Sequence, residues 1–226
     1  MELSIFDVVG PVMIGPSSSH TAGAARLARA ARMIVDEPFT HVRFGLYGSF
    51  EKTYRGHGTD RALVAGALGL AEYDERLADS FSLAKQAGLT WEFAADDLDG
   101  LHENSVRMTF TTADGSSREI VGSSIGGGQI IIRRIDGFET EIEARSVTLV
   151  VMQNDRPGVI RDITRVLAEQ GINIGVMKLS RRARGDVACT VIETDAPVPA
   201  HAVRAIAALD NIIRVQALDL REEEAL

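Results

Sequence analysis

The order of apolar segments after residue 146 is the feature that most restricts the fold of this chain. Short apolar or alternating runs predict strands, and apolar residues that recur every three or four positions predict helices. The predicted strands cover residues 147–152, 174–179, 187–194 and 212–218. The predicted helices start after the Asp155–Gly158 turn and at Pro199. This order, βαββαβ, is that of the ferredoxin-like fold, an antiparallel sheet with two helices on one face. We therefore expect a small domain of this kind over residues 146–226.

The preceding part of the chain predicts a separate mixed α/β domain over residues 1–140. Its predicted helices cover residues 21–35, 61–70 and 76–87, and its first predicted strands cover residues 41–47 and 89–94. Asp114-Gly115 predicts a hairpin between strands 106–112 and 117–121, and a further strand is predicted over 129–135. The short polar stretch 136–145 is the expected domain boundary.

Composition and charge exclude several classes of protein. The chain has 226 residues, 45% of them apolar and 25% charged, which fits two globular domains. It has no apolar run long enough for a membrane-spanning helix, and the N-terminus lacks a signal-peptide pattern, so we expect a cytoplasmic protein. The net charge of −8 argues against nucleic acid as a partner. Since Cys189 is the single cysteine, another chain would have to hold any iron–sulfur cluster.

Two segments predict a site for a small acid. Gly15–Thr21 brings three serines and His20 to the start of an Ala-rich helix, where free backbone N–H groups favour a carboxylate or a phosphate. Imidazole exchanges a proton near neutral pH. Gly48-Ser49 and Gly56–Asp60, with His57, also precede a helix. Each segment alone fits a simple helix cap or loop, but in an α/β fold two such helix starts can converge on one crevice.

Three further segments leave alternatives open. His102-Glu103-Asn104 suits a polar substrate or a solvated loop. The Ser123–Gly128 run lacks the spacing of a nucleotide-binding loop and predicts a tight turn or a close approach of the backbone. Asp155–Ile160 and Gly171–Ile174 suit an amino acid, because Gly158 permits close approach and Asn173 offers both a donor and an acceptor. The alternative for this last pair is an ordinary turn of the small domain.

These motifs resemble a known family. The quoted runs are Ser4–Asp7, Gly15–Thr21, Gly48–Phe50, Gly56–Asp60 and Ser124–Gly128. They resemble the beta chain of two-chain, iron–sulfur-dependent L-serine dehydratases over about the first 145 residues. The remainder resembles an ACT domain in Asp155–Ile160 and Gly171–Ile174. The N-terminal domain is also similar to the allosteric substrate-binding domain of some phosphoglycerate dehydrogenases.

The resemblance implies deamination of L-serine to pyruvate and ammonia, an L-serine ammonia-lyase activity that the chain lacks when alone. A [4Fe-4S] cluster held by a partner alpha chain would act as Lewis acid. His20 and His57 would be the catalytic residues, with His20 as the base. The implied substrate-binding residues are Ser17, Ser18, Ser19, Thr21, Ser49, Gly58, Thr59, Asp60 and Asn104. An amino acid would bind the ACT domain at Asp155, Pro157, Gly158, Val159, Ile160, Asn173 and Ile174, and this domain would form a homodimer.

The chain departs from the family at two positions, and two other functions are compatible with parts of its sequence. The family has His-Pro-Asn where this chain has His102-Glu103-Asn104, and it has glycine at the position of Tyr54. A non-catalytic amino-acid sensor is the main alternative function. A serine hydrolase built on Ser19 and His20 is disfavoured, because adjacent side chains rarely point at each other and the nucleophile-elbow pattern is absent.

Overall fold

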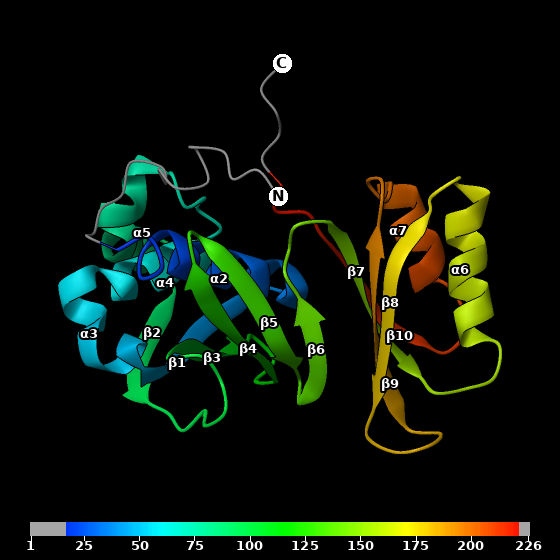
Figure 1. Cartoon of the computed structure of the whole chain (residues 1–226), viewed down its shortest axis with the longest axis horizontal. Coiled ribbons are helices and arrows are strands. Elements are labelled where there is room, and N and C mark those ends of the chain that lie inside the picture. The colour runs from blue at the N-terminus through cyan, green and yellow to red at the C-terminus, as the bar shows by residue number, and fades with distance from the viewer. Residues whose placement is uncertain (1–16, 222–226) are drawn as a thin grey trace. The chain divides into compact units, whose positions relative to one another are not determined.

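The computed structural model describes residues 17–221, so the Ser4–Asp7 and Gly15–Pro16 parts of the resemblance lie outside the described residues. The chain divides into two compact units, with the division between Gly137 and Phe138. The predicted mixed α/β character is confirmed, because the described residues form helices and two sheets (Figure 1). Within the described range, no helix combines the length and the apolar character needed to cross a bilayer.

The first sheet has six strands in the order β2-β1-β3-β4-β5-β6. Their bounds are β1 Phe39–Gly48, β2 Thr90–Ala95, β3 Asn104–Thr112, β4 Ser117–Gly126, β5 Gln129–Ile135 and β6 Phe138–Ile142. Strand β1 pairs in parallel with β2 and antiparallel with β3, and β3, β4 and β5 continue antiparallel. The predicted hairpin turn is present, because Gly115 has a φ of 84° and the Gly115 N–H donates to the Thr112 carbonyl at 3.0 Å.

Helices pack on one face of this sheet (Figure 1). They are α2 Ala22–Val35, α3 Ser49–His57, α4 Thr59–Leu68, the 3₁₀ helix η1 Glu75–Asp79 and α5 Ser80–Gln86. Small residues let α2 approach its neighbours closely. A Cβ at Gly66 of α4 would lie 2.2 Å from the Ala25 carbonyl oxygen, and one at Gly122 of β4 would lie 2.7 Å from Leu27 Cδ1. The alanines and glycines of this region therefore bring the start of α2 down onto the sheet.

Three elements differ from the prediction. Residues 49–57 form α3 rather than a loop; Phe50 is its one buried residue, so the segment has no apolar periodicity to reveal it. The helix predicted over 76–87 is divided, because residues 75–79 form a 3₁₀ helix before α5 begins. The polar stretch 136–145, the expected domain boundary, contains strand β6.

The second unit contains the predicted βαββαβ order. Its elements are β7 Val147–Asn154, α6 Val159–Glu169, β8 Ile174–Arg181, β9 Val187–Thr194, α7 Ala200–Ala207 and β10 Ile212–Leu218. The sheet order is β10-β7-β9-β8, with every pair antiparallel, and α6 and α7 cover one face (Figure 1). Ile163 and Leu167 of α6 pack with Leu149, Ile192 and Ile206 in the core between them. The periodicity of the sequence therefore predicted this unit correctly.

Candidate functional site

The serine turn before α2 gathers hydroxyl groups around one face of an imidazole. The N–H groups of His20 and Thr21 donate to the Ser17 carbonyl at 3.2 and 3.1 Å, which folds the chain back at the helix start. His20 Nδ1 consequently lies 3.0 Å from Ser17 Oγ and 3.3 Å from Ser19 Oγ, and the two serine oxygens are 3.1 Å apart. The prediction that adjacent Ser19 and His20 do not point at each other is therefore wrong.

The other nitrogen of His20 reaches the second predicted segment. His20 Nε2 lies 3.1 Å from the Oγ of Ser49, the first residue of α3. The start of α3 is held in place by Glu103, whose carbonyl accepts from the N–H groups of Ser49 and Phe50 at 2.7 and 3.3 Å. His20 thus joins the starts of α2 and α3 through a hydrogen bond at each ring nitrogen.

His57 approaches the same imidazole from the far end of α3. The His20 and His57 rings meet edge to face, with centroids 4.7 Å apart, and the hydroxyl of Thr21 donates to the His57 carbonyl at 3.3 Å. His57 is the last residue of α3, followed by Gly58 at a φ of 73°, so the alternative of a simple loop at this position is wrong. Ser17, Ser19, His20, Ser49 and His57 are called the His20 group below.

Burial keeps His20 neutral. Removal from water lowers the pKa of His20 below its ordinary value, and the electrostatic interaction with His57 lowers it further, while the charge of Glu103 raises it. The side chain is 7% exposed. A neutral imidazole keeps one nitrogen free to accept a proton. The His20 group therefore combines a base with hydroxyl donors at two helix starts.

Other predicted site residues lie beside this group without bonding to it. Thr59 is fully buried and Asn104 is 6% exposed. Thr59 Oγ1, Asn104 Oδ1 and His57 Nδ1 have no hydrogen-bond partner within residues 17–221. The Asn104 N–H donates to His102 Nδ1 at 3.1 Å, and the Ser18 carbonyl accepts from the Gly23 N–H at 2.9 Å.

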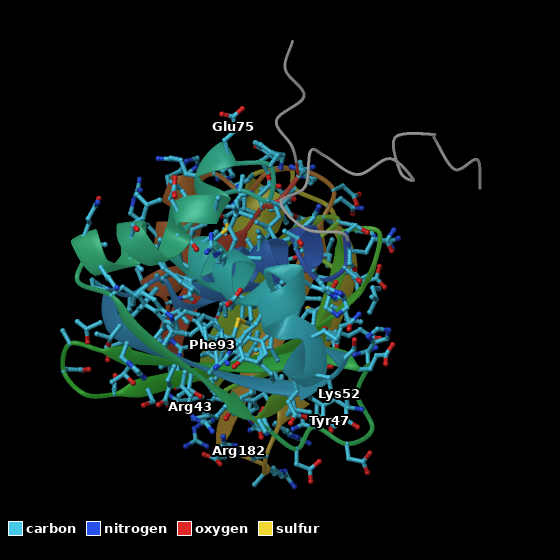
Figure 2. The ribbon with its side chains drawn as sticks, turned by 90° about the vertical axis from the view of Figure 1, so that its left-hand side faces the viewer. Arg43, Tyr47, Lys52, Glu75, Phe93 and Arg182 are labelled. Atoms are coloured by element: carbon cyan, nitrogen blue, oxygen red, sulfur yellow. The ribbon has the colours of Figure 1, made fainter. Side chains whose placement is uncertain are left out.

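Asp60 faces a different part of the first unit. It lines a hollow of about 300 Å³ that it shares with the aromatic residues Tyr54, Phe81, Trp91 and Phe93. Figure 2 shows Phe93 between the helices above it and the strands below it. Burial raises the pKa of the Asp60 carboxyl group, against the hydrogen bond from the Arg61 N–H that lowers it. Among the described residues, no hydrogen bond joins Asp60 to the His20 group. The structure therefore does not support the expected role of Asp60 in that site.

Ser124 is a residue that the sequence interpretation left out of the site. It is fully buried on β4, and its Oγ would lie 2.0 Å from a Cβ placed on Gly23 in the first turn of α2. The sequence predicts a tight turn or a close backbone approach for the Ser123–Gly128 run, and Gly126, Gly127 and Gly128 do have positive φ. The signal that could have identified Ser124 is the resemblance of Ser124–Gly128 to the family, because it places a serine directly before these glycines.

The predicted ligand residues of the second unit are engaged in contacts within the chain. Asp155 accepts from Arg181 Nη1 at 2.8 Å and from the Gly185 N–H at 3.1 Å, and the Arg181 hydrogen bond lowers the pKa of Asp155. Asn173 Nδ2 donates to Asp195 Oδ2 at 2.6 Å. Gly158 has a φ of 94° and precedes α6, which begins with Val159 and Ile160.

Asp155 and Asn173 lie at opposite ends of the second sheet. Strands β7 and β8 are each antiparallel to β9 and so run in the same direction. Asp155 follows the end of β7, whereas Asn173 and Ile174 mark the start of β8. Eight residues of β7 span about 26 Å at the usual rise of a strand. One amino acid therefore cannot touch both residues within a single chain.

The chain itself does not offer ligands for an iron–sulfur cluster. Cys189 is its single cysteine, and it is 1% exposed in β9. Among residues 17–221, no group of three or more His, Cys, Asp or Glu side chains is arranged to hold a metal ion. These donors do not fit a cluster that needs several thiolates.

Comparisons with known proteins match both parts of the chain to known families. The family model for the serine dehydratase beta chain matches residues 4–82, and that for the ACT domain matches residues 146–211. A probable L-serine dehydratase beta chain of Bacillus subtilis (strain 168) is 40% identical over 212 residues, covering 94% of this chain and 96% of that one. An L-serine dehydratase beta chain of Peptoniphilus asaccharolyticus is 40% identical over 198 residues, covering 87% and 89%.

A D-3-phosphoglycerate dehydrogenase of Mycobacterium tuberculosis (strain ATCC 25618 / H37Rv) is 30% identical over 141 residues, or 62% of this chain and 26% of that one. The predicted similarity to phosphoglycerate dehydrogenases is thereby confirmed. The two beta chains match nearly from end to end, whereas the dehydrogenase matches over a quarter of its length. The chain therefore belongs to the family of L-serine dehydratase beta chains.

Proposed function

We propose that this chain is the substrate-binding subunit of an L-serine ammonia-lyase, which converts L-serine to pyruvate and ammonia with a partner alpha chain. The observation that carries the proposal is the imidazole of His20, hydrogen-bonded at Nδ1 to Ser17 and at Nε2 to Ser49. Residues 1–140 would form the substrate-binding domain and residues 146–226 the regulatory ACT domain.

The helix starts would bind the substrate carboxylate. The first turns of α2 and α3 carry partial positive charge and backbone N–H groups. Ser17 and Ser19 add hydroxyl donors within 3.3 Å of the same imidazole. A carboxylate bound there would set the α-carbon of serine close to His20.

His20 would remove the α-proton. Its lowered pKa keeps the imidazole unprotonated at neutral pH, the state that a general base needs. The bonding electrons of the C–H bond would form the Cα–Cβ double bond as the β-hydroxyl leaves. Hydroxide is a poor leaving group, and a [4Fe-4S] cluster on the alpha chain would supply the Lewis acid that assists it. His57, with its ring centroid 4.7 Å from that of His20, would orient the base.

Reconstitution with a partner tests this function. We expect no serine deamination by the isolated chain, and turnover once a cysteine-bearing alpha chain with an anaerobically reconstituted cluster is added. The beta-chain names of the relatives support such a partner. Turnover by this chain alone would contradict the proposal.

Replacement of His20 separates the enzyme from a non-catalytic amino-acid sensor. His20→Ala should lower the turnover of the reconstituted complex by about two orders of magnitude or more. His41→Ala is the matched control, because His41 is bonded to Thr90 at the sheet surface and lies outside the His20 group. A sensor would retain its response to amino acids in both variants.

The ACT domain would bind an amino acid between two copies of the chain. Since Asp155 and Asn173 lie at opposite ends of one sheet, a ligand that contacts both needs a second copy. The edge strand β8 exposes Val176, Met177 and Leu179, which a pairing partner would cover. Sedimentation of the full chain with and without L-serine, compared with Asn173→Ala, tests this. If the chain stayed a monomer and bound no amino acid, the ACT domain would have a structural role only.

A further inference from the structure

Two of the buried polar atoms that lack hydrogen-bond partners within residues 17–221 lie on neighbouring strands at one end of the first sheet. They are Asn104 Oδ1 and Ser124 Oγ, and their side chains are 6% and 0% exposed. A buried polar atom left without a partner costs folding free energy. A pair of such atoms near a candidate active site is therefore explained most directly by a ligand that completes their hydrogen bonds.

The register of the sheet sets these two residues side by side. Strands β3 and β4 pair Ser105 with Ser123 and Val106 with Gly122, and one more step in that register brings Asn104 opposite Ser124. Side chains alternate between the faces of a strand. Ser124 therefore shares the face of Gly122, which α2 covers, because a side chain at Gly122 would meet Leu27.

Both helix starts of the candidate site lie against this pair. Ser124 Oγ lies beneath the first turn of α2, at the place that a Gly23 side chain would take. Asn104 is paired across the sheet with Gly48, the residue before Ser49, whose Oγ is bonded to His20 Nε2. The two unpartnered atoms thus lie between the starts of α2 and α3, on the sheet side of the His20 group.

The chemistry of the two atoms suits a cation that has only donors. An amide Oδ1 accepts hydrogen bonds and a serine Oγ can do the same, whereas an ammonium group has three donors and no acceptor. The helix starts favour the carboxylate of an amino acid. A carboxylate placed against Asn104 Oδ1 would instead bring two acceptors together. The two ends of an α-amino acid therefore match two different parts of this site.

Building on the proposed function, we propose that Ser124 Oγ and Asn104 Oδ1 accept hydrogen bonds from the α-ammonium group of the substrate. Ser124 is then a specificity-determining residue, which selects an amino acid over the corresponding acid without the amino group. The competing interpretation is that Ser124, like Gly122, is merely a small residue that lets α2 pack closely. Alanine at position 124 would satisfy that packing role equally well.

Kinetics of the reconstituted complex with Ser124→Ala tests the inference. The measured quantities are the KM for L-serine and the competitive inhibition constant of 3-hydroxypropionate, which lacks the ammonium group. Competitive inhibition reports on the active site without interference from any amino acid bound to the ACT domain. Ser123→Ala is the matched control, because Ser123 belongs to the same strand, faces away and is bonded to Ser105 Oγ at 2.7 Å.

Loss of a hydrogen bond to a charged group should raise the KM for L-serine by about tenfold to a hundredfold in Ser124→Ala. The inhibition constant of 3-hydroxypropionate should stay unchanged, and so should both constants in Ser123→Ala. The urea midpoint of Ser124→Ala should equal or exceed that of the wild type, since an unpartnered hydroxyl is removed.

A parallel rise of both constants, or no change in either, would overturn the inference while leaving the proposed function intact. A wild-type complex that never deaminates serine would instead overturn the proposed function, and the inference with it.

Discussion

Replacement of Gly23 by alanine tests the close approach that forms the candidate site. An added methyl in a helix normally stabilises it by up to about 1 kcal/mol relative to glycine. Here the Cβ would lie 2.0 Å from Ser124 Oγ and 2.9 Å from Ser124 Cβ. Overpacking of this kind costs about 1–3 kcal/mol, so Gly23→Ala should lower the free energy of unfolding by up to about 2 kcal/mol.

The sign of the effect should reverse when Ser124 is glycine. Both clashing atoms are then gone, and the nearest remaining neighbour, the Ser18 carbonyl oxygen at 3.7 Å, is at an ordinary contact distance. In the Ser124→Gly background, Gly23→Ala should therefore stabilise the protein by up to about 1 kcal/mol. The difference between the two backgrounds measures the coupling of α2 to β4.

Urea unfolding followed by tryptophan fluorescence measures these changes in the first unit. The chain has a single tryptophan, Trp91, and it lies in β2. Gly56→Ala in α3 is the control, because its Cβ would meet nothing within 4 Å and should stabilise the protein by about 0.5–1 kcal/mol. Equal effects of Gly23→Ala in both backgrounds would refute the close approach.

Three further predictions concern charge and hydrogen bonding. Because the pKa of His20 is lowered from 6.5, the acid limb of kcat/KM should lie below pH 6.5. The free energy of unfolding should also decrease as pH falls from 6.5 toward the folded-state pKa, since the unfolded chain binds a proton that the folded chain resists, and His20→Gln should reduce this slope in urea titrations. Ser49→Ala leaves His20 Nε2 without its partner and should lower kcat by about tenfold with a smaller change in KM. A rise in KM with kcat unchanged would mean that Ser49 has a binding role only. Burial raises the pKa of Asp60 above 3.8, so its ionisation destabilises the fold as pH rises from 3.8 toward the folded-state pKa. Asp60→Asn should gain urea resistance over the wild type across this interval and leave the KM for L-serine unchanged, and a large rise in KM would return Asp60 to the substrate site.

The parts of the fold that the sequence predicts well are those with local periodicity. Val159, Ile163 and Leu167 recur at helical spacing, and α6 forms there with these side chains in the core. The two histidine segments were recognised because their glycines, hydroxyls and imidazoles are unusual at helix starts. The resemblance then linked them, and the structure brings His20 and His57 together.

Tertiary structure alone decided what depends on contacts between distant segments. Helix α3 has one buried residue, and its first N–H groups are satisfied by the Glu103 carbonyl, a partner more than fifty residues away in the sequence. Strand register and side-chain orientation determine which part of the first unit the Asp60 and Ser124 side chains face. They also determine that Asp155 and Asn173 lie far apart. Local periodicity determines which residues form an element and which of its faces is apolar, but the pairing of distant elements determines which polar atoms meet.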